Sequence, residues 1–384
     1  MIKSLKRRHF LRRISSYILV VSLFLGPPGL SAGRNLSLPV SVTAKTAFAA
    51  DDSLAAETAA SGQMSDKQAQ DDKVYVSGQP VGIYLRTKGL LVLGTQGKAA
   101  QKRLQSGDYI TEVNGIPLKS KKELMTYLQE NQEKELTFTI LREGNRQKLR
   151  IKPTFSDETD SWQIGAWIRS DTQGIGTLTY ICPDGTYTAL GHGINDYDIG
   201  VPMNLSGGSI YQARISTIIK GRQESPGEIL GNIDYVPDKY LGTVDINTPR
   251  GIMGKISLNQ KMSESGPMAK APGDLCPDRK LYSIAAPDQV KKGKALLRTS
   301  ISGKSKDYTI EIENVSLNKK DRLKTLKIHV TDPELLSLTG GIIQGLSGSP
   351  ILQDGKLVGA VTHVLVRDPA RGYGILAADM RGKR

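Results

Sequence analysis

Hydrophobic and polar positions alternate in short runs over most of the chain beyond residue 73, which predicts a protein built mainly from β-strands. Two pairs of such runs are separated by Asp-Gly, a dipeptide that favours a tight hairpin because glycine readily adopts the positive φ that the turn requires. The two predicted hairpins join 176–181 to 186–188 through Asp184-Gly185, and 351–353 to 356–361 through Asp354-Gly355. Both hairpins should give rigid support to the residues at their ends.

Short strands recur from about Trp162 to the carboxyl end, with further turn signals at 206–208 and 249–251. This spacing is typical of a barrel or sandwich, so residues 160–384 are predicted to form one β-domain. The 40 glycines and the aromatic content of 5% agree with turn-rich β structure and argue against an all-helical fold.

Residues 73–153 form a second predicted domain, of about 80 residues. Its strand runs lie at 81–85, 89–94 and 107–115. A helix is predicted at about 121–130, with Ser120 as its cap. Residues 51–72 are rich in Ala, Ser, Asp and Gln and lack apolar periodicity, so they are predicted to be a flexible linker.

The first 50 residues carry the features of a secretory leader or a short signal anchor. Six Lys or Arg side chains occupy the first 13 positions, an apolar stretch follows at 17–25, and Gly26-Pro27-Pro28 ends it. The stretch is shorter than the roughly 20 residues that a spanning helix needs. Ala47-Phe48-Ala49 offers a cleavage point. We therefore expect export across a membrane or anchoring to it.

The formal net charge of +14 belongs largely to this leader, because residues 1–50 contain eight Lys or Arg and no acid. Without the leader the charge falls to about +6, so no nucleic-acid partner is required. The chain has neither a C-x-x-C pair nor an H-E-x-x-H motif, and we expect no metal and no cofactor. Cys182 and Cys276 could form one disulfide in an exported protein or stay as two thiols, and the sequence leaves both open.

The strongest chemical signal is the segment Gly345-Leu346-Ser347-Gly348-Ser349-Pro350, which has the glycines of a strained turn that exposes a nucleophilic serine. A serine hydroxyl is a poor nucleophile until a neighbouring base accepts its proton, so a histidine is needed. His9 lies in the leader, and His329 and His363 lie in predicted strands, where packing is the ordinary role. His192 stands between two glycines at the end of a predicted strand, which makes it the best candidate for the base.

The segment Gly345-x-Ser347-Gly348-x-Pro350 is similar to the nucleophile loop of chymotrypsin-like serine peptidases, and His192 precedes it as in that architecture. The resemblance implies a double β-barrel. Ser347 is a better nucleophile than Ser349, because the backbone amides of Gly345 and Ser347 could then converge on the oxyanion that forms during attack. Ser349 would instead shape the turn.

Residues 73–153 resemble a PDZ domain, chiefly through Gly107-Asp108-x-Ile110-x-x-Val113-Asn114-Gly115-x-x-Leu118 and the helix that follows. This resemblance implies that Val81, Gly82 and Ile83 form the loop whose amides receive a peptide carboxylate, and that the next strand pairs with an extended peptide or protein tail. A structural β-domain that binds no peptide is the alternative, since a fold alone does not establish binding.

The chain as a whole resembles the stage IV sporulation protein B peptidases, through its leader, the PDZ-like region, Ala189-Leu190-Gly191-His192-Gly193 and the serine segment. In that family an Asp fifteen residues before the serine is implicated, so the resemblance implies Asp332 as the third catalytic residue. Such an acid would hold the imidazole in the tautomer that accepts the seryl proton.

Other assignments of the acid and the base stay open. Asp234 and Asp245 lie between the two predicted hairpins, which is the usual place of the acid in chymotrypsin-like enzymes. Asp332 could instead be a helix cap or a turn residue before Pro333. His363 is an alternative base.

Two functional hypotheses follow. In the first, the protein is an exported serine endopeptidase whose PDZ module selects or restrains the peptide. The family resemblance implies that it acts in the intermembrane space of the forespore, cleaves itself near its amino end, with 51–72 as the cleaved region, and cuts a membrane-anchored regulator. That cut triggers processing of a late mother-cell sigma factor. In the second, the protein is a non-enzymatic signalling or scaffold protein with a degenerate peptidase domain.

Overall fold

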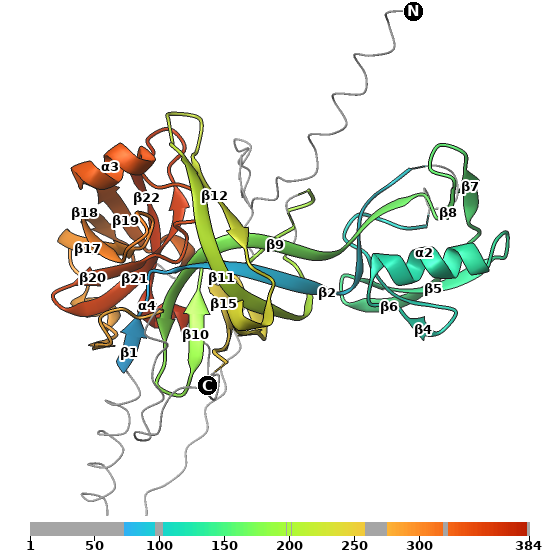
Figure 1. The fold of residues 1–384 in the computed structure, drawn as a ribbon, viewed down its shortest axis with the longest axis horizontal. Helices are drawn as coiled ribbons and strands as arrows, with labels where there is room; N and C mark the ends of the chain where they lie inside the picture. Colours follow the sequence, from blue (N-terminus) through green and yellow to red (C-terminus); the bar gives the residue numbers. More distant parts are fainter. Residues whose placement is uncertain are drawn as a thin grey trace, which may run out of the picture. The chain divides into compact units, whose positions relative to one another are not determined.

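The computed structural model describes residues 73–96, 103–196, 198–200, 202–257, 275–317 and 322–381. Strands dominate this part of the chain (Figure 1), which confirms the predicted mainly β class. The leader predicted at 1–50, with His9, and the linker predicted at 51–72 lie outside the described residues.

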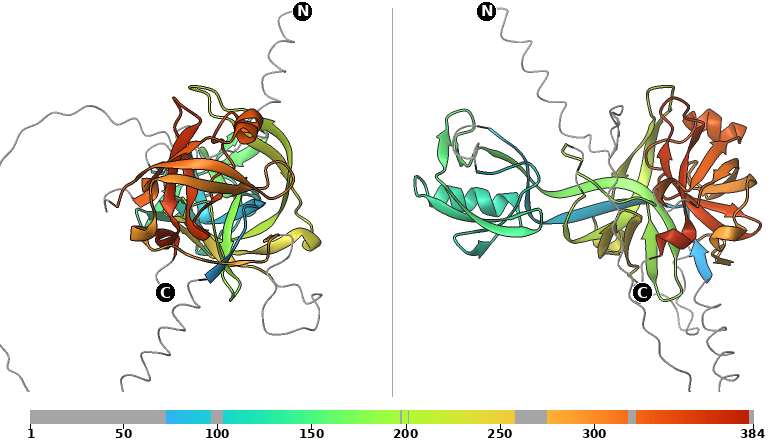
Figure 2. Two further views of the ribbon diagram at one scale, coloured as in Figure 1. Left: turned by 90° about the vertical axis from the view of Figure 1, so that its left-hand side faces the viewer. Right: turned by 180° about the vertical axis from the view of Figure 1, so that it is seen from behind.

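The carboxyl-terminal strands close into a six-stranded antiparallel barrel in the order β17, β18, β19, β22, β21 and β20, drawn in orange to red in Figure 2. Their bounds are β17 (Gly293–Thr299), β18 (Lys306–Val315), β19 (Leu326–Val330), β20 (Pro350–Gln353), β21 (Lys356–Val364) and β22 (Arg371–Leu376). Alternate side chains point inward because the side-chain period of a strand is two, as for Tyr308, Ile310 and Ile312 of β18, which are fully buried. Three short elements accompany the barrel, η3 (Arg322–Lys324), α3 (Pro333–Thr339) and α4 (Ala377–Met380).

A second group of strands forms a half-barrel, in which β15, β10, β9, β2, β11 and β13 are successive neighbours. Its outer strands, β13 and β15, meet through the isolated bridge between Gly242 and Ile256. The six strands are β2 (Pro80–Thr95), β9 (Ala166–Ile181), β10 (Thr186–Ala189), β11 (Leu205–Ile219), β13 (Tyr240–Val244) and β15 (Gly251–Lys255). Shorter elements beside them are β1 (Lys73–Val76), β12 (Glu228–Ile233), η1 (Pro237–Lys239), β14 (Ile246–Thr248) and β16 (Leu281–Ser283). The short helix η2 (Pro287–Gln289) instead lies against β21 of the barrel, where Gln289 accepts a hydrogen bond from Lys356 at 3.0 Å. Barrel and half-barrel together confirm the predicted double-barrel arrangement.

Both predicted hairpins are present. The strands β9 and β10 pair in antiparallel fashion, and so do β20 and β21. In the second hairpin, Asp354 and Gly355 have φ angles of 50° and 75°, which are the positive values that a tight two-residue turn requires. The catalytic candidates therefore lie next to well-supported strands.

A smaller unit surrounds the helix α2 (Lys121–Glu130), which begins and ends where the sequence predicts (Figure 1). The helix starts there because the Ser120 hydroxyl accepts the amide of Glu123 at 3.2 Å. Leu124 and Leu128 lie on one face of the helix and pack in one apolar cluster with Phe138. The strands of this unit are β3 (Tyr109–Val113), β4 (Ile116–Pro117), β5 (Leu136–Arg142), β6 (Asn145–Ile151), β7 (Thr154–Ser156) and β8 (Ser161–Gln163).

Strand pairing corrects the predicted domain boundary at residue 73. The strand β1 pairs with β9 and β16, and the first half of β2 pairs with β9 and β11, so residues 73–86 belong to the half-barrel. The second half of β2 instead sends Leu90 and Val92 into the core around α2. The smaller unit is thus inserted into the half-barrel rather than preceding it, because one long strand serves both cores.

Candidate active site

Ser347 lies in a tight loop between α3 and β20. The loop turns at Gly345 and Gly348, whose φ angles of 98° and 92° favour glycine. Within the loop the amide of Ser349 donates to the carbonyl of Leu346 at 2.9 Å. Ser349 is fully buried, whereas Ser347 is half-buried and lines a pocket. The predicted glycine turn is therefore present, and Ser347 is the hydroxyl that a substrate could reach.

Strand β9 holds the backbone of this loop through two threonines. The amide of Thr177 donates to the Ser347 carbonyl at 3.1 Å, and its hydroxyl donates to the Gly345 carbonyl at 2.7 Å. The hydroxyl of Thr179 donates to the Gly348 carbonyl, also at 2.7 Å. A Cβ at Gly348 would lie 2.2 Å from the Thr177 carbonyl oxygen, so only glycine allows the loop to approach the strand this closely.

His192 lies three residues beyond the end of β10, after a strained turn. Leu190 has a φ of 74°, and the amide of Gly191 donates to the Ala189 carbonyl at 3.0 Å, which is the geometry of the rare positive-φ γ-turn. Strain of this kind is concentrated at functional sites. The Leu190 amide also donates to the Thr177 carbonyl at 3.2 Å. Thr177 therefore holds the histidine loop and the serine loop together.

The far side of the histidine loop is fixed by Asn247 of β14. Its side-chain oxygen accepts the Ile194 amide at 2.8 Å, and its side-chain nitrogen donates to the Ile194 carbonyl at 2.9 Å. The amide of Gly193 donates to the Pro249 carbonyl at 3.1 Å. His192 is thus anchored by backbone contacts on both sides.

The imidazole of His192 is arranged to accept a proton. Its Nδ1 lies 2.9 Å from the carbonyl oxygen of Gly193. Since a carbonyl oxygen only accepts, Nδ1 carries the proton in this contact and Nε2 keeps its lone pair. Burial lowers the pKa of His192 below 6.5, against the opposing effect of the Gly193 contact. The ring is therefore neutral at pH 7, which is the state that a general base requires.

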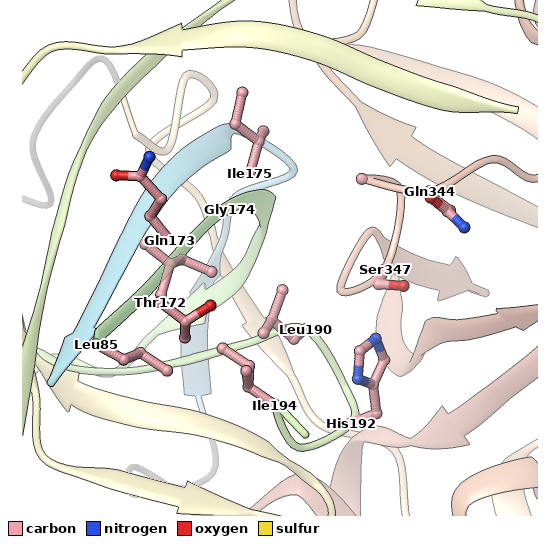
Figure 3. A pocket seen from close by; sticks show the side chains of 12 residues that line it. Leu85, Thr172, Gln173, Gly174, Ile175, Leu190, His192, Ile194, Gln344 and Ser347 are labelled. Carbon is pink, nitrogen blue, oxygen red and sulfur yellow. The ribbon is translucent and has the colours of Figure 1, made fainter. Parts of the chain in front are cut away.

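His192 and Ser347 line one pocket of about 600 Å³, part of which is open to solvent. Figure 3 shows the two side chains next to each other at one end of this pocket, facing the β9 residues Thr172 to Ile175. In this conformation the Ser347 hydroxyl donates to the Thr362 carbonyl at 3.1 Å. A carbonyl cannot remove the proton, so the hydroxyl must turn from Thr362 to His192 before it attacks.

The amides of Gly345 and Ser347, which are predicted to stabilise an oxyanion, both belong to residues that line the pocket. Within the part of the chain that the structure describes, neither the Gly345 amide nor the Ser347 amide donates to a protein group. The intervening amide of Leu346 is used, since it donates to the Ile343 carbonyl at 3.1 Å. Donors without partners are costly in a protein interior unless a ligand satisfies them, and two at one site would stabilise a negatively charged oxygen. This geometry supports the predicted oxyanion hole.

Asp332, the acid implied by the family resemblance, does not contact His192. Its carboxylate caps α3 and accepts three backbone amides, from Glu334 at 3.0 Å, Leu335 at 3.2 Å and Thr309 at 3.2 Å. Burial raises the pKa of this carboxyl, and the amide hydrogen bonds outweigh that effect and lower the pKa overall. In this conformation the contacts of Asp332 are those of a helix cap, and its assignment to the triad, which the family resemblance implies, stays a prediction.

The other candidate acids do not take its place. Asp234 forms an ion pair with Arg214 at 3.0 Å, and Asp245 is exposed. Among the described residues no carboxylate contacts His192. The neighbour of His192 is instead His363 of β21, the alternative base, whose ring centroid lies 5.5 Å away. The sequence separates these two histidines widely, and the fold brings them together.

The structure also corrects the predicted peptide loop at Val81, Gly82 and Ile83. These residues lie inside β2, which pairs with β9 on one edge and with β11 on the other, and both hydrophobic side chains are buried. The same hydrophobic-Gly-hydrophobic pattern recurs at Ile164-Gly165-Ala166, where β9 begins and Gly165 has a φ of 69°. Residues 166–169 pair with β2 along one edge, and no strand of the described chain pairs with their other edge.

Three further expectations concern groups outside this site. In the described residues no cluster of three or more His, Cys, Asp or Glu side chains is placed to hold a metal ion. Cys182 and Cys276 do not form a disulfide, and burial raises the pKa of Cys276 to about 12. Across the described ranges, no helix has the length and apolar character needed to cross a membrane.

Comparison with known proteins gives two family matches. The family model of the SpoIVB peptidase S55 matches residues 160–381, and that of the PDZ domain matches residues 82–152. No curated protein matches this chain. Among solved structures, the PDZ domain of the SdrC-like protein from Listeria monocytogenes is 24% identical, with 21% of this chain and 87% of that chain covered and a TM-score of 0.20. The HtrA-type protease AlgW with a tripeptide is 12% identical, with 54% of each chain covered and a TM-score of 0.30.

Proposed function

Because the chain belongs to the SpoIVB peptidase S55 family, it is a serine endopeptidase, and we propose that Ser347 is its nucleophile and His192 its general base. The observation that carries this proposal is the pocket that both side chains line, where the amides of Gly345 and Ser347 have no acceptor among the described residues. The family resemblance predicted from the sequence is confirmed.

The geometry supports a sequence of steps for peptide hydrolysis. Ser347 Oγ attacks the carbonyl carbon of the substrate while Nε2 of His192 takes its proton. The amides of Gly345 and Ser347 donate to the oxyanion that forms. The imidazolium then gives its proton to the leaving amine as the C–N bond breaks, and a water molecule repeats the sequence to free the serine. The Gly193 carbonyl orients the imidazole, although its dipole stabilises the imidazolium less than a carboxylate would.

The finer part of the proposal concerns sporulation. We propose that the peptidase is exported across or anchored to the membrane in the intermembrane space of the forespore. There it cleaves itself within 51–72 and cuts a membrane-anchored regulator, which triggers processing of a late mother-cell sigma factor. Membership of the SpoIVB family supports this role, and the leader features of residues 1–50 support export.

Labelling and self-cleavage test the proposal together. The full chain is treated with a fluorophosphonate probe and its fragments are measured by mass spectrometry, for the unchanged protein and for Ser347→Ala, His192→Ala and Ser349→Ala. We expect labelling and self-cleavage in the unchanged protein and in Ser349→Ala, and neither in the other two variants. Labelling that persists in Ser347→Ala would refute the assignment of Ser347 as the nucleophile. Unchanged fragments in that variant would refute self-cleavage by this serine.

The chain contains a PDZ domain, and we infer that a peptide tail pairs with residues 166–169 rather than with β2 at Val81 to Ile83. The open edge of this segment and the positive φ of Gly165 support the inference. Amide hydrogen exchange measured with and without added carboxyl-terminal peptides tests it. Slower exchange at 166–169 is expected, and protection confined to other segments would contradict it.

A further inference from the structure

One wall of the active-site pocket is an edge of β9 with which no strand of the described ranges pairs at residues 173–175. β9 pairs with β2 without a register shift between Thr177 and Asp171. Both backbone groups of Thr177 point away from β2, since its amide donates a hydrogen bond to the Ser347 carbonyl and its carbonyl accepts one from the Leu190 amide of the histidine loop. In an antiparallel ladder the backbone groups of successive residues point to opposite edges. Those of Ile175 and Gln173 therefore also point away from β2.

No strand or loop among the described residues bonds this edge at Gln173 or Ile175. Both residues line the pocket that contains Ser347 and His192 (Figure 3). An exposed edge of this kind pairs with extended peptides through main-chain hydrogen bonds. The serine loop occupies the next position of the same edge, at Thr177. A peptide that forms hydrogen bonds with Ile175 would therefore lie about 7 Å from the serine loop along the strand, which is the length of two residues in an extended chain.

Hydrophobic side chains are the largest group among the residues that line the pocket, and no Asp, Glu, Lys or Arg is among the described lining residues. Its hydrophobic lining consists of Ile83, Leu85, Ile175, Leu190 and Ile194. The other lining residues are glycines, the catalytic candidates, and the neutral side chains of Thr172, Gln173 and Gln344. A charged side chain placed here would lose water without gaining a partner, whereas an apolar side chain gains from burial.

The position of His192 indicates which part of a substrate passes this pocket. Leu190 and Ile194 flank His192 in its own loop, and both line the pocket. Because His192 must give its proton to the leaving amine, the chain on the carboxyl side of the scissile bond leaves over this loop. The apolar lining and the open β9 edge therefore face the carboxyl-side part of the substrate.

We propose that the peptidase binds its substrate as an added strand on the β9 edge at Gln173 and Ile175. In this arrangement an apolar side chain, one or two residues beyond the scissile bond on its carboxyl side, fills the pocket. The proposal rests on the assignment of Ser347 and His192 and adds the class of substrate that they cut. It predicts a preference for neutral, hydrophobic residues after the cut and for substrates that can adopt an extended conformation.

A peptide library with the unchanged full chain gives the first test. Cleavage sites are mapped by mass spectrometry, and peptides that are not cut are scored by how well they protect Ser347 from the fluorophosphonate probe. We expect Leu, Ile, Val, Met or Phe at one of the two positions after the cut to be favoured at least tenfold over Asp or Lys, on the scale of a good apolar pocket. Absence of labelling refutes the proposed function. Labelling without this preference refutes only the inference.

A scan of single backbone N-methyl groups through one good peptide tests the strand pairing. Methylation removes one main-chain donor, so it should act at alternate positions only. We expect a loss of cleavage of at least tenfold at the position that bonds Ile175, and less than threefold at its immediate neighbours. Equal losses at adjacent positions, or no loss on the carboxyl side, would overturn pairing at this edge.

A charge reversal in the pocket supplies the third test. Ile175→Lys should raise the cleavage of a peptide with Glu in the pocket, relative to one with Leu, by at least tenfold. Ile219→Lys is the matched control, because Ile219 is 43% exposed and does not line the pocket. Ile175 is half-buried, so the folding of the variant is checked by fluorophosphonate labelling. If Ile175→Lys does not fold, Ile175→Ala replaces it, and the preferred substrate residue in the enlarged pocket is then expected to change from Val towards Phe. Unchanged ratios in a folded variant would refute the pocket assignment.

Discussion

Replacing Thr177 by valine should slow catalysis more than it weakens substrate binding. The change keeps the shape of the side chain and removes the hydrogen bond to the Gly345 carbonyl at 2.7 Å, a buried contact. The carbonyl is then left without its donor, which costs about 1–3 kcal/mol of unfolding free energy. The same contact sets the peptide plane next to the Gly345 amide, so the oxyanion loses part of its stabilisation.

Full removal of one oxyanion donor lowers kcat by about 10²–10³-fold, so displacement of the donor should lower it by about 10–100-fold with little change in KM. Thr179→Val is the matched control, because it removes an equally short bond between the same strand and the same loop, to the Gly348 carbonyl. Urea unfolding should show similar destabilisation of both variants, and peptide kinetics should show a loss in kcat for Thr177→Val alone. Equal kcat values in the two variants would refute the idea that Thr177 positions the oxyanion donors.

Three further outcomes follow from other contacts of the molecule. The acid limb of kcat/KM should have its midpoint below pH 6.5, because burial lowers the pKa of His192 and its neutral form is the base; a midpoint at or above 6.5 in a pH–rate profile would contradict this. Gly348→Ala should abolish fluorophosphonate labelling, since its Cβ would lie 2.2 Å from a carbonyl oxygen of β9, whereas Gly355→Ala, with nothing within 4 Å, should label normally and lose about 1 kcal/mol from its positive φ. Arg298 of β17 is almost buried and forms an ion pair with Asp307 of β18 at 2.7 Å. Arg298→Met should lower the unfolding free energy by about 2 kcal/mol in urea titration, less than for a fully buried pair, because the side chain of Asp307 is 31% exposed; no change would show that the pair contributes nothing.

Local signals explain what could be predicted from the sequence. The Asp-Gly turns, the Ser120 cap and the glycines around Ser347 and His192 each act over a few residues, so a short segment contains all the information needed. Hydrophobic alternation likewise predicts strands without knowledge of their partners. These features are present in the structure at the predicted places.

The predicted roles that differ from the contacts of this structure are those that depend on distant pairing. Val81 to Ile83 have the pattern of a PDZ loop, and the same pattern suits the buried strand that the structure contains. For Asp332 the local signal of a helix cap before proline competed with a family resemblance, and in this structure the cap is what its contacts show. Thr177 gave no signal at all, because a threonine in a strand is ordinary until its partners 168 residues away are known.

The register of β9 determines whether the whole site can form. Along one edge of this strand, Gln173 and Ile175 line the pocket, and Thr177 forms hydrogen bonds with the loops of both catalytic candidates. Residues two positions apart on the strand therefore contact the proposed substrate site and the loops of the candidate base and nucleophile. If β9 slipped by one residue against β2, all these backbone groups would point towards β2. The side chains of β9 that now face the core would also move to the opposite face of the sheet. The slip is opposed because Val81, Ile83 and Leu85 of β2 are fully or almost fully buried in the half-barrel core. The apolar core of the half-barrel therefore fixes the positions of catalytic candidates that come from the barrel and from the half-barrel.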